Sequence, residues 1–68
     1  MKISARNVLT GKIVEVKKGA TTAHVRIDLG GSVVTASITN ESVDELKLVP
    51  GMTASAVIKA SDVMVAVE

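Results

Sequence analysis

The chain has 68 residues, a net charge of +1 and neither cysteine nor aromatic residues. This length fits one domain, residues 1–68, and the lack of cysteine excludes a disulfide framework and a thiolate metal site. The near-neutral charge and the missing aromatic rings argue against nucleic-acid binding, because small barrels that bind single strands stack bases on such rings. A hydrophobic fraction of 47% without cross-links favours a homo-oligomer, since so short a chain is marginally stable alone.

The first element that the pattern predicts is one bent strand over residues 2–17. Thr10-Gly11 indicates a bend or bulge within it, and Val14 and Val16 are expected to share one face. This strand begins with an unusual group of residues, Ser4-Ala5-Arg6-Asn7, which carries a hydroxyl, a guanidinium and an amide.

The second and third strands are predicted over residues 22–29 and 32–39, joined at Gly30-Gly31, a strong hairpin signal. Residues 22–29 alternate between apolar and polar side chains, as is typical of a strand with one buried face. The residues expected to face the core are Ala23, Val25, Ile27 and Leu29. The residues expected to face solvent are His24, Arg26 and Asp28.

Residues 40–46 change period and predict a short helix, with Val43 and Leu46 packed inward. Thr39, Asn40 or Ser42 are candidate N-caps, and Ser42 with the glutamate three residues later fits a capping box.

Two more strands are predicted after a turn at Val49-Pro50-Gly51, one over residues 52–59 and one over residues 63–67. The last strand is apolar on both faces, so it is either central or covered by another subunit. The order β-β-β-α-β-β predicts an all-β fold with one short helix, an OB-like five-stranded barrel. An SH3-like barrel or an open sheet are the alternatives.

No constellation in the sequence indicates catalysis or a metal centre, so we expect no enzyme and no cofactor. His24, the single histidine, lies on an outward strand face, and the carboxylates are scattered over surface positions. Three places carry donors for an oxyanion: the Ser4–Asn7 group, the hydroxyls of Thr39 and Ser42, and Lys59-Ala60-Ser61. Taken singly, each place also fits a solvated strand edge or a helix cap.

Three motifs together resemble the molbindins, small cytoplasmic molybdate-binding proteins. The motifs are Ser4-Ala5-Arg6-Asn7, Ile38-Thr39-x-x-Ser42-Val43, and Val57-Ile58-Lys59-Ala60 followed by Val63-Met64. The resemblance covers essentially the whole chain. It implies an OB-like barrel that assembles as a hexamer, a trimer of dimers, with the oxyanion bound between subunits.

The resemblance also implies which residues hold the anion. They are Ser4, Ala5, Arg6, Thr39, Ser42, Lys59 and Ala60. The ligand would be molybdate, bound whole through its oxygens, and tungstate should compete because it is close in size. Some related domains carry a basic residue three positions after the serine, but this chain has Glu45 there, so that contact is not implied.

The function expected from this resemblance is intracellular storage and buffering of molybdate. No apolar leader and no run long enough to span a membrane are present, which predicts a cytoplasmic protein without a membrane partner. One alternative is an OB-like oligomerisation module without a working anion site. Another is a small barrel that binds nucleic acid.

Overall fold

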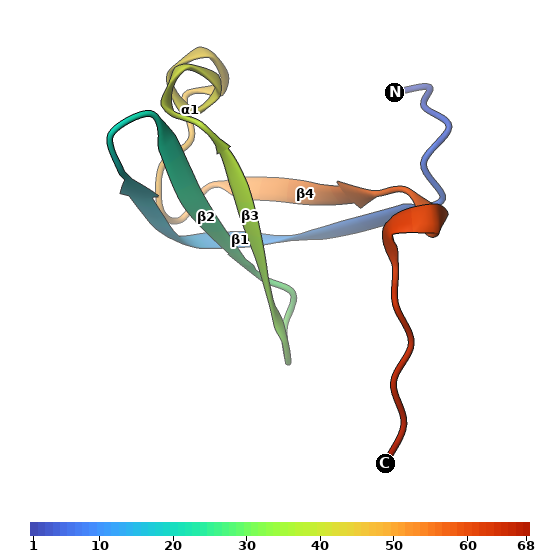
Figure 1. Cartoon of the computed structure of the whole chain (residues 1–68). Coiled ribbons are helices and arrows are strands. Elements are labelled where there is room, and N and C mark those ends of the chain that lie inside the picture. Colours follow the sequence, from blue (N-terminus) through green and yellow to red (C-terminus); the bar gives the residue numbers. More distant parts are fainter.

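The computed structural model describes residues 1–68 and consists of a curled antiparallel sheet with one short α-helix (Figure 1). The strands are β1 (Asn7–Lys18), β2 (Thr22–Asp28), β3 (Val33–Thr39) and β4 (Thr53–Ile58). Helix α1 (Asn40–Leu46) follows β3, and a 3₁₀ turn, η1 (Ala60–Asp62), follows β4. The strand order is β3-β2-β1-β4, and the helix between β3 and β4 confirms the OB-like class. None of the helices has the length and hydrophobicity that crossing a bilayer requires.

The sheet has four strands, whereas the sequence predicted five. Residues 63–67 form no strand and extend away from the sheet as a tail (Figure 1). The physical reason is that η1 turns the chain away from the sheet, so the tail meets no strand of its own chain. Residues 2–6 also lie outside the sheet, because β1 begins only at Asn7.

Strand β1 joins the two halves of the sheet. Residues 7–12 pair with β4, and residues 12–18 pair with β2. Gly11 allows this change of partner, because a Cβ at that position would lie 2.2 Å from the backbone oxygen of Asp28. At the expected bend, Thr10-Gly11, β1 is therefore continuous, and its backbone closely approaches the backbone of β2 at Asp28.

A register shift in β1 lies between Ile13 and Glu15, beyond the predicted position. It inserts Val14 as an extra residue that turns outward, so that Ile13 is buried and Val16 is half-buried. The expectation that Val14 and Val16 share a face was wrong, since strict alternation fails at a bulge.

The core confirms the alternation predicted for β2. Ala23, Val25 and Ile27 are buried, and Leu29 is half-buried against them. The remaining buried residues come from the other elements and are Ile13, Val43 and Ala56. With six buried residues among 68, the single chain leaves much of its apolar surface exposed.

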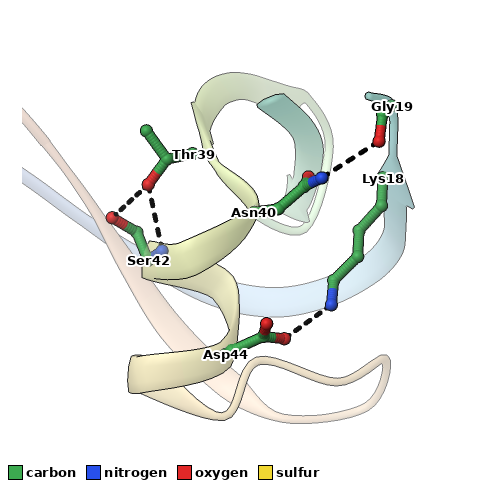
Figure 2. Close-up of polar contacts among 6 residues, drawn as sticks. All are labelled: Lys18, Gly19, Thr39, Asn40, Ser42 and Asp44. Atoms are coloured by element: carbon green, nitrogen blue, oxygen red, sulfur yellow. Dashed lines mark hydrogen bonds and ion pairs between the residues drawn. The ribbon is translucent and has the colours of Figure 1, made fainter. Parts of the chain in front are cut away.

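Helix α1 is capped by Thr39, whose Oγ1 accepts a hydrogen bond from the Ser42 N–H at 3.0 Å (Figure 2). Ser42 thus lies inside the helix, which excludes the capping box predicted to begin there. Val43 is buried as expected, but Leu46 is 61% exposed, which corrects its predicted inward packing. The helix ends at this residue, and Lys47 closes it in the left-handed conformation with φ 54°.

Both predicted turns are present. The Leu29 N–H donates to the Ser32 carbonyl at 2.8 Å across Gly30-Gly31. The Met52 N–H donates to the Val49 carbonyl at 3.3 Å, and Gly51 has the positive φ that the third residue of a type II turn requires.

Candidate functional site

The start of β1 and the end of β4 lie side by side and carry two of the three predicted oxyanion elements. Asn7, the first residue of β1, pairs with Ile58, the last residue of β4. The segment before β1 and the segment after β4 therefore emerge at the same end of the sheet (Figure 1). We call these residues the strand-end cluster: Ser4, Ala5, Arg6, Lys59 and Ala60.

Asn7 stabilises this junction, although the sequence analysis did not include it among the site residues. Its Nδ2 donates a hydrogen bond to the Ile58 carbonyl at 3.1 Å, in addition to the backbone pairing of the two strands. The signal in the sequence was an asparagine at a strand position, where this residue type is depleted unless its side chain has a partner.

The strand-end cluster is positively charged and has no internal counter-charge. Arg6 and Lys59 are both exposed, and the chain's only ion pair joins Lys18 to Asp44 at the other end of β1. Asp62 is the nearest carboxylate in sequence to Lys59, yet the two form no ion pair. Two neighbouring cations without a carboxylate favour binding of an anion.

The cluster also supplies neutral donors. Ser4 has an exposed hydroxyl, and the backbone N–H groups of Ala5 and Arg6 make no hydrogen bond within the chain. Hydroxyl, amide, guanidinium and ammonium groups all donate to oxygen, so the set suits an oxyanion. It offers no carboxylate, thiolate or imidazole for a metal cation, and no group of three such residues occurs anywhere in the chain.

Thr39 and Ser42 lie at a different end of the fold from the strand-end cluster (Figure 1). Their hydroxyls contact each other, with Thr39 Oγ1 donating to Ser42 Oγ at 2.8 Å (Figure 2). Ser42 accepts this bond, so its own hydroxyl proton remains available to a further acceptor. Within one chain, five of the seven predicted site residues flank the paired ends of β1 and β4, and these two lie elsewhere, at the start of α1.

Comparisons with known proteins identify the family of this chain. Residues 3–65 match the profile of the TOBE domain. The chain belongs to the TOBE domain family. A probable molybdenum-pterin-binding protein from Haemophilus influenzae is 49% identical over the full length of both chains.

Solved structures of similar proteins have the same fold. A molybdate-binding protein from Sporomusa ovata superposes with a TM-score of 0.93 at 41% identity, covering 97% of this chain and 98% of that one. The cytoplasmic molybdate-binding protein ModG, with molybdate bound, gives a TM-score of 0.89 at 48% identity, covering 94% of this chain and 46% of ModG. These relatives confirm the resemblance to the molbindins.

This TOBE domain also has a polar pocket, apart from the strand-end cluster, that the sequence analysis missed. Its volume is ≈ 240 Å³, and it lies where β1 meets β2. The residues lining it are Lys17, Lys18, Gly19, Thr22 and His24. Lys17 lies opposite His24 across the strands, whereas the ammonium of Lys18 is already paired with Asp44 (Figure 2). Only the strand register reveals this pocket, because Lys17 and His24 belong to different strands.

Proposed function

We propose that this chain, as one OB-like domain of residues 1–68, binds molybdate or tungstate between the subunits of a homo-oligomer. The observation that carries the proposal is the strand-end cluster, in which Arg6 and Lys59 lie at one end of the sheet without a carboxylate partner. The relatives named for binding molybdate or molybdenum-pterin support the same ligand.

The charges and donors of the cluster match the proposed ligand. Arg6 and Lys59 together carry two positive charges, which offset the two negative charges of the molybdate dianion. Charge-assisted hydrogen bonds contribute about 1.5–3 kcal/mol each. Several of them are sufficient for a dissociation constant near 1 μM, which corresponds to about −8 kcal/mol. Sulfate has the same charge and shape, so selectivity must come from the size of the cavity.

The proposed oligomer accounts for the exposure of the cluster in one chain. Water competes for every donor that is solvated, and a second subunit would exclude that water and strengthen the contacts. Thr39 and Ser42 would then reach an anion from a neighbouring subunit. The proposed assembly is the predicted hexamer, a trimer of dimers. The proposed role of the protein is to store and buffer molybdate in the cytoplasm, without a catalytic step.

Native mass spectrometry with and without molybdate tests this function, with sulfate as the control. We expect an oligomer that gains discrete molybdate masses at concentrations where sulfate adds none. An oligomer that takes up neither anion would contradict the proposal and favour the oligomerisation module. Equal uptake of both anions would show that the site lacks selectivity.

A further inference from the structure

Asn40, the first residue of α1, connects the start of the helix to the hairpin turn between β1 and β2 (Figure 2). Its side-chain Nδ2 donates a hydrogen bond to the Gly19 carbonyl at 3.0 Å. Its backbone N–H donates to the Thr21 carbonyl at 2.9 Å. Both bonds leave the helix and end on the turn, so one residue holds the helix start at two points of the hairpin.

The hairpin turn that Asn40 contacts is itself held in place. The Gly19 N–H donates a hydrogen bond to the Thr22 carbonyl at 2.7 Å, which closes the turn. Thr22 then pairs with Thr39 in the ladder between β2 and β3. The strand pairing therefore holds Thr39 against β2, and Asn40 continues the same contact one residue further, beyond the end of β3.

Asn40 lies between the two residues whose hydroxyls belong to the predicted oxyanion site. Thr39 Oγ1 accepts a hydrogen bond from the Ser42 N–H at 3.0 Å and donates to Ser42 Oγ at 2.8 Å. Of the two hydroxyl protons, the one on Ser42 is therefore left for a ligand. Its direction depends on the backbone at Thr39, which has φ −71° and ψ 150°. A residue that fixes the backbone at this point also fixes where the proton of Ser42 can point.

The intrinsic stability of the helix does not explain an asparagine at position 40. Asparagine is a poorer helix former than alanine. The side chain of Asn40 is half-buried and directed toward the hairpin (Figure 2). Its Oδ1 is buried and makes no hydrogen bond within the chain, which costs free energy. The contact that offsets these costs is the bond from Nδ2 to Gly19, so the role of the residue lies in the connection to the turn.

We propose that Asn40 is a positioning residue for oxyanion binding. By holding the backbone after Thr39 against the hairpin turn, it directs the Ser42 hydroxyl toward the anion. Asn40 acts through Ser42 and has no contact with the anion of its own. A donor that is fixed before the anion arrives loses less conformational freedom on binding, and this strengthens the contact. The inference rests on the proposed function, because it assumes that the Ser42 hydroxyl binds the oxyanion.

A double-mutant cycle, read by isothermal titration calorimetry with molybdate, tests this role. Asn40→Ala is expected to raise the Kd about 2- to 10-fold, the range that one hydrogen bond accounts for. Ser42→Ala removes the hydroxyl, so in that background Asn40→Ala is expected to raise the Kd no further. Asn40→Gln keeps the amide and the charge, so it is expected to raise the Kd less, with the same dependence on Ser42. Circular dichroism checks that each variant keeps its fold.

Thr10→Val is the matched control, because it removes another exposed side-chain hydrogen bond, from Thr10 to Ser55 at 2.8 Å, without changing the charge. Its Kd is expected to stay unchanged. An unchanged Kd in Asn40→Ala, or equal weakening with and without the Ser42 hydroxyl, would overturn the inference. If Arg6→Ala still weakens binding in that case, the proposed function stands. An unaltered chain that takes up no molybdate would overturn both proposals.

Discussion

At the residue scale, two cations from the two halves of the sequence determine the proposed chemistry. Arg6 precedes the first strand and Lys59 follows the last, and either one alone fits an ordinary exposed charge at a strand end. The pairing of Asn7 with Ile58 makes them neighbours. Because neither has a carboxylate partner, both charges remain available to a ligand.

Replacing Arg6 tests this assignment. Arg6→Ala should weaken molybdate binding by roughly 10- to 150-fold, since the loss of one charge-assisted hydrogen bond costs about 1.5–3 kcal/mol. Isothermal titration calorimetry measures the change. Arg26→Ala is the matched control, because Arg26 is an exposed arginine on β2 outside the cluster. Equal weakening in both variants would indicate attraction by net charge and would contradict a specific site.

At the scale of the element, the turn from β3 into α1 has a structural role that is independent of any ligand. The Oγ1 of Thr39 accepts from the Ser42 N–H, one of the donors at the helix start that lack an intrahelical partner. The same threonine belongs to the predicted anion site. The cap and the anion site are compatible, because Thr39 donates its proton to Ser42 Oγ and the Ser42 hydroxyl keeps its own proton for a ligand.

Thr39→Ala should lower the free energy of unfolding by about 1 kcal/mol, because the cap is lost. Thr39→Ser should keep most of the stability, since it retains the hydroxyl. Urea denaturation followed by circular dichroism measures both variants. If Thr39→Ala leaves stability unchanged, the hydrogen bond to Ser42 does not stabilise the helix.

At the scale of the whole molecule, the single chain leaves its sheet open and much of its apolar surface exposed. Its six-residue core supports a sheet that curls without closing, and its C-terminal tail is apolar and exposed. A second copy in the proposed oligomer would cover part of this apolar surface. Assembly and anion binding would then be linked, since the anion bridges groups that assembly brings together.

Molybdate should therefore stabilise the folded assembly. At a hundred times the dissociation constant, binding raises the free energy of unfolding by about 2.7 kcal/mol per site. Differential scanning calorimetry should show a higher Tm with molybdate than with sulfate at equal ionic strength. An equal shift with both salts would mean that screening, and not a specific site, is responsible.

The sequence by itself determined the features that depend on neighbours along the chain. Alternation in residues 22–28, the Gly30-Gly31 hairpin and the Val49-Pro50-Gly51 turn follow from local backbone preferences, and all three appear as predicted. The bulge at Val14 escaped prediction, because an alternating pattern does not reveal where an extra residue is inserted.

The tertiary structure decided what depends on strand pairing. The register of β1 against β4 brings Ser4, Ala5 and Arg6 to Lys59 and Ala60, while Thr39 and Ser42 remain apart from them. It also decided that residues 63–67, whose composition is that of a strand, do not join the sheet of their own chain. The physical reason is that a strand needs a partner edge, and the direction of the turn before it determines which edge the chain can reach.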